Sequence, residues 1–298
     1  MDGRDGTGIV SLTEDTDRLI ITLICLVKYE HSIYMVYSKF SNYLIYRVHM
    51  LFKSGAADIH YMEEKVHRVK LETGIRSINF PHGDESYNLD VEVNYCVINN
   101  LDVGVEIPYV FWRPDSGDDV DTIGDMIVKS RLLFLKGREG NPISLTIQPF
   151  FKVPTPENDV DVLRSGGGGG VYDGGSGFST GETDFGFVFI ATREMSPLLS
   201  AHMNMGYTFI NKPSWVTDYD NVFSFKVAVE YSADDEIQIV GEVNSETNKD
   251  PQADDLLSIL LGARYRMMEG VLLDAGFSAG ISDASPDSTA TVGLTMDF

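Results

Sequence analysis

STATVGLTMDF, residues 288–298, closes the chain and alternates between two kinds of side chain. From Ala290 to Phe298 every second position is apolar, and the positions between carry Thr, Gly or Asp. Successive side chains of a β-strand point to opposite faces, so this strand has one apolar face and one small, polar face. Two such faces predict a strand that lies between two different solvents.

The same alternation recurs back to about residue 69 in segments of roughly 10 residues, which is typical of transmembrane β-barrels. We therefore expect an all-β fold in residues 68–298, a closed, antiparallel, up-and-down transmembrane β-barrel of about 12 strands. The predicted strands are 69–80, 86–97, 101–112, 123–135, 143–153, 183–193, 198–210, 221–232, 236–247, 255–267, 271–282 and 288–298.

The two faces of these strands can be assigned from residue type. Met205 and Val227 belong to apolar faces and are expected to contact lipid, whereas Asn204 and Ser224 are expected to point inward. A soluble β-sandwich would show the same alternation with its apolar face buried. The even number of strands, the alternating loop lengths and two belts of outward aromatic residues favour the membrane barrel.

The connections between the predicted strands alternate in length. Short turns such as Ala233–Asp235 alternate with longer acidic or Gly-rich segments such as Arg113–Thr122 and Pro154–Glu182. Outer-membrane barrels have short periplasmic turns and longer outer loops, so both ends of the barrel are expected on the periplasmic side. The Gly-rich residues 154–182 are expected either as a flexible outer loop or as a loop folded into the mouth of the barrel.

Charge and composition exclude several functions. The formal net charge is -22, which argues against a nucleic-acid partner, because phosphate binding needs basic surface. Cys25 and Cys96 are the two cysteines, too few for a disulfide framework. The acidic run Asp115–Asp121 lacks the Gly and terminal Glu spacing of a calcium loop, which leaves weak divalent-cation binding as the alternative to a solvated loop. We expect no cofactor and no resident metal.

Residues 1–67 depart from the barrel pattern. A signal peptide needs a basic start, an apolar stretch and a small-residue cleavage site. Here the start is acidic, and the short apolar run Leu19–Val27 is followed by Lys28, Tyr29 and Glu30. We treat this segment as separate from the barrel, with three interpretations: an incorrect start, a folded plug or extra element, and an atypical export signal.

Charged residues of both signs fall on the predicted inward face. They are expected either to form a rigid network of internal ion pairs or to line a polar pathway that selects solutes. The lumen-lining candidates are Asp102, Glu106, Asp125, Lys129, Arg131, Lys226, Glu230, Arg264 and Arg266.

Enzymatic interpretations are weak. Ser200 and His202 share one face of a predicted strand, as a hydrolase pair would, but no third orienting group or oxyanion donor accompanies them. We expect no catalytic residues.

Several short motifs follow one another in a characteristic order. They are Leu71–Gly74, Asn99–Tyr109, Gly124-Asp125 with Lys129 and Arg131, Gly181–Gly186, Leu198–Tyr207 and Gly293–Phe298. In this order, residues 69–298 resemble the family of MetA-pathway phenol degradation proteins, outer-membrane barrels often called transporters.

The resemblance implies a place in the outer membrane of a Gram-negative-type bacterium, among lipid and lipopolysaccharide. It implies passive passage of small, often hydrophobic or aromatic molecules, the alternative being a non-conducting barrel with a structural or surface-interaction role. The terminal strand ending at Phe298 resembles the signal read by the barrel assembly machinery.

Overall fold

The computed structural model describes residues 7–15, 18–29, 32–40, 68–137, 142–155, 179, 181–212 and 219–298. The chain divides into two units, residues 1–48 and 49–298. Most of the Gly-rich segment 154–182 lies outside the described residues, so neither interpretation of that loop is tested. Among the described residues, no helix is long and apolar enough to cross a membrane.

The first unit contains a three-stranded antiparallel sheet. Its strands are β1 (Thr7–Asp15), β2 (Arg18–Tyr29) and β3 (Ser32–Phe40), paired in that order. The described strands of the second unit form a sheet of their own. The treatment of residues 1–67 as separate from the barrel stays a prediction.

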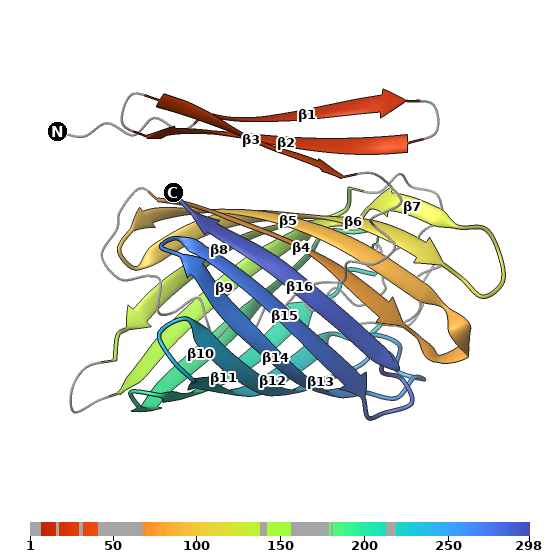
Figure 1. Ribbon diagram of the computed structural model, residues 1–298. Helices are drawn as coiled ribbons and strands as arrows, with labels where there is room; N and C mark the ends of the chain where they lie inside the picture. Colours follow the sequence, from red (N-terminus) through yellow and green to blue (C-terminus); the bar gives the residue numbers. More distant parts are fainter. Residues whose placement is uncertain are drawn as a thin grey trace. The chain divides into compact units, whose positions relative to one another are not determined.

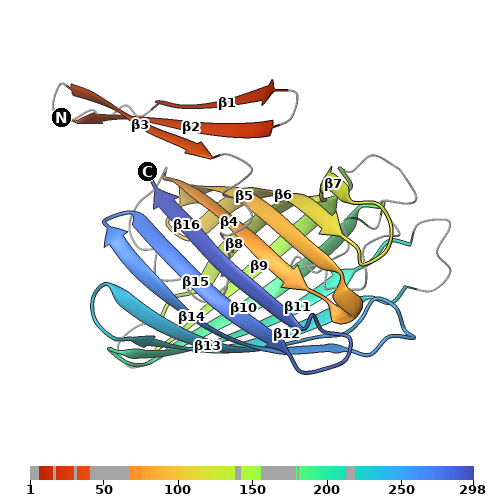
Figure 2. The same ribbon diagram turned by 45° about the vertical axis from the view of Figure 1, so that its right-hand side comes forward.

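The second unit is a closed antiparallel barrel (Figures 1 and 2), which confirms the predicted fold class. Twelve strands form the wall and β7 is an extra strand at one edge. The strands are β4 (Val69–Asn79), β5 (Glu85–Ile98), β6 (Leu101–Arg113), β7 (Val120–Ile123), β8 (Met126–Leu135), β9 (Ile143–Val153), β10 (Asp184–Ser196), β11 (Leu199–Phe209), β12 (Val222–Ser232), β13 (Ile237–Glu246), β14 (Leu256–Met268), β15 (Val271–Gly280) and β16 (Ser288–Asp297).

Closure joins the first and last strands of the barrel. β16 pairs with β4 from Ser288↔Asn79 to Asp297↔Lys70, and β4 continues into β5. At the rim, the Phe298 N–H donates to the Val69 carbonyl at 2.9 Å, and the Val69 N–H donates to the Phe298 carbonyl at 3.3 Å. Both ends of the barrel therefore lie at one rim, as expected from an even number of wall strands.

The predicted bounds of the strand 123–135 and of the loop before it were wrong. The structure divides this region into β7 and β8, with Gly124 and Asp125 between them, and β7 pairs with the outer part of β6. The break lies opposite Pro108, which has no N–H to donate to the ladder. Its carbonyl accepts from Gly124 at 2.8 Å, and the Thr155 hydroxyl contacts the Gly124 carbonyl and the Met126 N–H.

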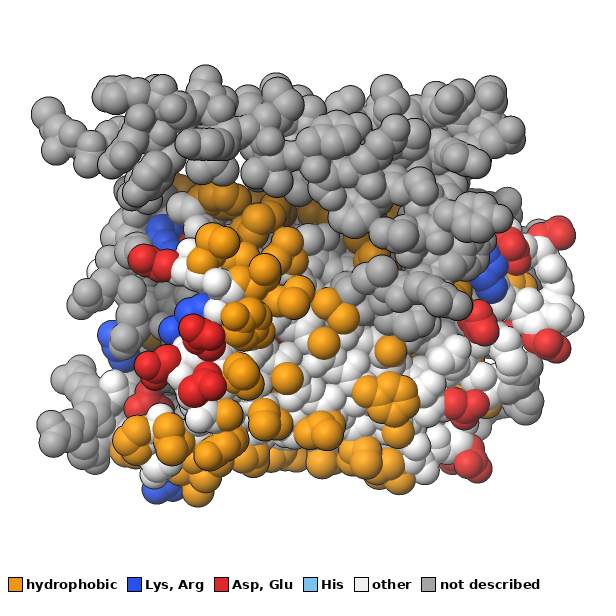
Figure 3. Space-filling model, viewed as in Figure 1, with side chains coloured by type: hydrophobic (Ala, Val, Ile, Leu, Met, Phe, Trp, Pro, Cys, Tyr) orange, Lys and Arg blue, Asp and Glu red, His pale blue; other side chains and the backbone are white. Residues whose placement is uncertain are grey.

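The exterior of the barrel is apolar. Outward Met205 and Val227 are each 39% exposed, whereas inward Ser224 is 8% exposed, so the predicted faces are confirmed. Figure 3 shows hydrophobic side chains spread over the described outer surface, with charged side chains gathered towards two ends. Aromatic rings also meet on this face, as where Phe185 and Phe209 stack with centroids 4.6 Å apart. An exposed apolar band of this kind is what lipid requires.

Substitutions on the two faces of the strands test directly which face contacts lipid. Met205→Arg or Val227→Arg should destabilise the inserted barrel by about 2–4 kcal/mol, because the charge would face hydrocarbon near mid-strand. Asn204→Arg or Ser224→Arg should cost much less, since these positions face the interior. Denaturant unfolding in lipid measures both, and equal costs at the two kinds of position would contradict the face assignment.

The separate sheet gives a second test. Because β16 closes on β4 without help from β1–β3, a chain that starts near Gly55 behind a standard signal should still assemble. The measurement is the heat-modifiable gel shift of a folded barrel, compared with that of the full chain. Assembly of the full chain alone would show that the N-terminal segment is part of the barrel or its plug.

Candidate functional site in the barrel interior

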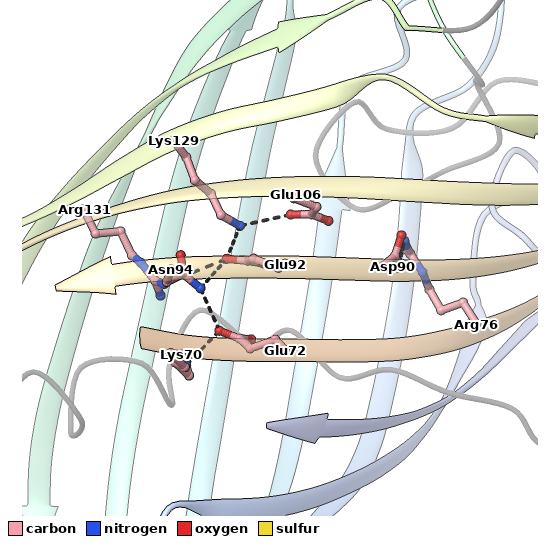
Figure 4. A network of polar contacts seen from close by, with 9 residues as sticks. All are labelled: Lys70, Glu72, Arg76, Asp90, Glu92, Asn94, Glu106, Lys129 and Arg131. Carbon is pink, nitrogen blue, oxygen red and sulfur yellow. Dashed lines mark hydrogen bonds and ion pairs between the residues drawn. The ribbon is translucent and has the colours of Figure 1, made fainter. Parts of the chain in front are cut away.

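Three glutamates lie side by side on the inner wall of the barrel (Figure 4). The register places Glu72 of β4 opposite Glu92 of β5, and Glu92 opposite Glu106 of β6. Like charges directly opposite each other on neighbouring strands are destabilising. This carboxylate row, Glu72, Glu92 and Glu106, therefore needs partners that offset its repulsion.

The partners come from the same wall. Lys129 of β8 places its ammonium 2.7 Å from Glu92 Oε1 and 3.0 Å from Glu106 Oε2, which joins two members of the row. The Asn94 amide nitrogen donates to Glu92 Oε1 at 2.9 Å and to Glu72 Oε1 at 3.1 Å. Lys70 Nζ lies 2.8 Å from Glu72 Oε1. Each carboxylate thus has at least one donor, and the row forms one connected network.

A glycine makes room for this network. Gly104 faces inward on β6 between Asp102 and Glu106, opposite Asn94. A Cβ placed on Gly104 would lie only 2.2 Å from Asn94 Oδ1 and 3.4 Å from the Val93 carbonyl. The Asn94 side chain can therefore lie across β6 only because position 104 has no side chain.

Further charges extend the network along the same wall. Arg76 Nη2 lies 2.8 Å from Asp90 Oδ2, and Arg131 Nη2 lies 3.9 Å from Glu92 Oε1. Arg131 is also opposite Asp102 in the register between β8 and β6. These pairs are largely shielded from solvent, where ion pairing is screened less than at the surface.

A second group of charges lies on β12–β15. Arg264 Nη1 reaches Glu230 Oε2 at 2.8 Å, although β13 lies between their strands. Val240 is the register partner of Glu230 on β13 and is 1% exposed. Asp274 lies opposite Arg264 on β15 and extends over Gly293 of β16, where a Cβ would meet its carboxylate at 2.7 Å.

The outer mouth has its own charged group. Lys152 Nζ lies 3.1 Å from Asp125 Oδ2. In the loop after β13, burial and the nearby charge of Lys152 together lower the pKa of the Lys249 ammonium to about 8, although neighbouring carboxylates act in the opposite direction. The Lys249 ammonium lies 5.5 Å from the centroid of the Tyr219 ring.

An apolar cluster lies on the inner face between the outer ends of β4 and β6. It consists of Ile78, Phe80, Val110 and Trp112, all at most 8% exposed, with Val120 packed against it. The rings of Phe80 and Trp112 have centroids 5.4 Å apart. Along β6 the inward side chains thus change from apolar near the outer end to acidic near the middle.

The structure gives each lumen-lining candidate a position. Buried inward positions hold Asp125, Lys129, Arg131, Lys226, Glu230 and Arg264, and Asp102 and Glu106 are half-buried on the same surface. Arg266 is exposed near the end of β14, beside a register shift. That these residues line a conducting path stays a prediction.

Glu72 and Glu92 of the carboxylate row were not among the predicted lumen-lining candidates, although the alternation of their strands placed them inward. Glu72 and Glu92 alternate with apolar neighbours as Glu106 does, but only the register shows that the three meet. Of the Ser200–His202 pair, His202 Nδ1 pairs with the Thr192 hydroxyl of β10 at 3.0 Å. The expectation of no catalytic residues stays a prediction.

Replacing Gly104 tests the network. Gly104→Ala should destabilise the barrel by about 1–3 kcal/mol, because the new methyl group displaces the Asn94 side chain and crowds the backbone. Gly241→Ala is the matched control, since a Cβ at that outward position meets nothing within 4 Å. Unfolding in lipid should separate the two variants, and an equal effect would mean that Asn94 moves aside without cost.

No family model and no curated protein matches this chain. Solved structures do match it. An outer membrane channel from Pseudomonas putida F1 is 11% identical with a TM-score of 0.62, over 80% of this chain and 98% of that one. The NanC porin is 11% identical with a TM-score of 0.51, over 76% of this chain and 98% of that one.

Similarity to solved structures at 11% sequence identity establishes the fold alone. They support the MetA-pathway resemblance only at the level of the barrel. Since antiparallel barrels with an apolar exterior belong to the outer membrane, the expected location is confirmed. The chain therefore has the fold of outer-membrane β-barrel channels and porins.

Proposed function

We propose that this barrel is a passive outer-membrane channel for small molecules, and that hydrophobic or aromatic molecules are among its solutes. The observation that carries the proposal is the contrast between the two surfaces of one closed wall. The outside is apolar, whereas the inside carries buried charged and amide side chains from β4 to β15. A polar inner surface across a lipid-facing wall is the arrangement found in barrels that conduct solutes.

The size of the barrel supports a narrow pathway. Eight strands leave an interior that side chains just fill, and porins of 16–18 strands leave an open aqueous channel. Twelve wall strands lie between these limits. The long charged side chains on β4–β8 and β12–β15 occupy part of the interior, so conduction would pass close to them.

The apolar cluster near the outer ends of β4 and β6 supports the choice of solute. Phe80 and Trp112 face inward, where a water-filled porin would have polar side chains. Binding of an apolar solute to such a surface is favourable by roughly 25 cal/mol per Å² of apolar area removed from water. The cluster is closed in the structure, so a solute reaches it only when these side chains move apart.

The density of ion pairs favours one other function, that of a non-conducting structural barrel. Arg264–Glu230 and Lys129–Glu92 are almost fully buried pairs, and a closed interior would hold them in the same way. A scaffold of this kind would present its outer loops to partners and pass no solute.

Planar bilayers separate the two functions. The purified full chain should give stepwise conductance, because a continuous polar inner surface admits ions, and a silent membrane would favour the structural barrel. In liposomes, Trp112→Asn should slow the uptake of a small neutral aromatic solute, whereas Trp112→Phe should retain it. Equal aromatic uptake by both variants, with conductance intact, would argue against a role of the apolar cluster.

A further inference from the structure

We infer that the channel prefers cations to anions, and that the carboxylate row sets this preference. The inference rests on the proposed function, because it concerns which solutes pass through the same interior. It follows from the charge balance of the inner surface and from the way in which the row already holds ammonium groups.

Acidic side chains outnumber basic ones inside the described part of the barrel. Nine carboxylates and five cations are among its buried side chains, an excess of four negative charges. Three half-buried carboxylates on the inner face, Asp102, Glu106 and Asp297, are balanced by three half-buried cations, Arg68, Lys70 and Arg76. Lys249 adds one positive charge at the outer mouth, which leaves the balance negative. The buried carboxylates are Glu72, Asp90, Glu92, Asp125, Asp184, Glu230, Glu242, Glu246 and Asp274, and the buried cations are Lys129, Arg131, Lys152, Lys226 and Arg264.

An excess of fixed charge inside a low-dielectric wall must be balanced nearby. Lipid around the barrel offers no counterions, so mobile ions of opposite sign enter the interior and accumulate there. Because the fixed excess is negative, the accumulated ions are cations. Cations are then the main carriers of current, as in channels with rings of acidic side chains.

The carboxylate row is the part of the wall best suited to contact these cations. The Lys129 ammonium lies within 3.0 Å of both Glu92 and Glu106, so the row already accepts a cation between two carboxylates. Asn94 is 3% exposed, and its carbonyl oxygen, which lies over Gly104, has no hydrogen-bond partner among the described residues. Carboxylate and amide oxygens together favour inorganic cations and primary ammonium groups.

The test measures ion preference in the full chain. In planar bilayers under a potassium chloride gradient, the reversal potential should show a permeability ratio of K⁺ to Cl⁻ greater than one. The preference should fall as ionic strength rises, because the Debye length shrinks from about 10 Å at 0.1 M to about 3 Å at 1 M.

Charge variants then test the row. Glu92→Gln should shift the reversal potential towards zero, whereas Lys129→Ala combined with Arg131→Ala should shift it towards stronger cation preference. Glu194→Gln removes the same charge from an exposed position at the end of β10 and should leave the preference unchanged. Glu106→Gln replaces Glu92→Gln if the latter does not assemble.

The outcomes are distinct. Conduction with anion preference, or with none, would overturn the inference while the channel function stands. Equal shifts in Glu92→Gln and Glu194→Gln would overturn the role of the row. A silent membrane would overturn the proposed function together with the inference.

Discussion

Every backbone amide and carbonyl of a chain in lipid must find its partner within the protein. Here that constraint is met by a wall of twelve strands that closes on itself, because β16 pairs with β4 along ten residues and joins the last strand to the first. The apolar exterior and the polar interior both depend on this closure. Once the strands surround a common interior, successive side chains of each strand point in turn to lipid and to the lumen.

Closure concentrates charge as well. Side chains that would be solvated on an open sheet face one another across a confined interior, and the wall around them is a poor dielectric. The structure meets this cost mainly by pairing, with Lys129 between two glutamates and Arg264 reaching across β13 to Glu230. Since the carboxylates still exceed the cations, the same network that stabilises the wall gives the interior a net sign.

The strands and their faces could be predicted because alternation with period two is a local property of the sequence. Val227 and Met205 were assigned outward from their neighbours alone, and the structure agrees. The carboxylate row could not be predicted in this way. Its alignment depends on which residues of neighbouring strands pair, and this is set by turn length and by irregularities such as the register shift between Cys96 and Ile98. The break at Gly124 was missed for a related reason, since the missing donor at Pro108 belongs to another strand.

The carboxylate row also has a consequence for assembly. A slip of two residues between β6 and β8 would leave every side chain on its proper face, so hydrophobic burial would hardly distinguish the correct alignment from the wrong one. The slip would move Lys129 away from Glu106 and leave carboxylates buried without their cation, a cost of several kcal/mol. The ion pairs therefore help to set the register between neighbouring strands. In a barrel with a neutral interior, the turns would have to set that register without them.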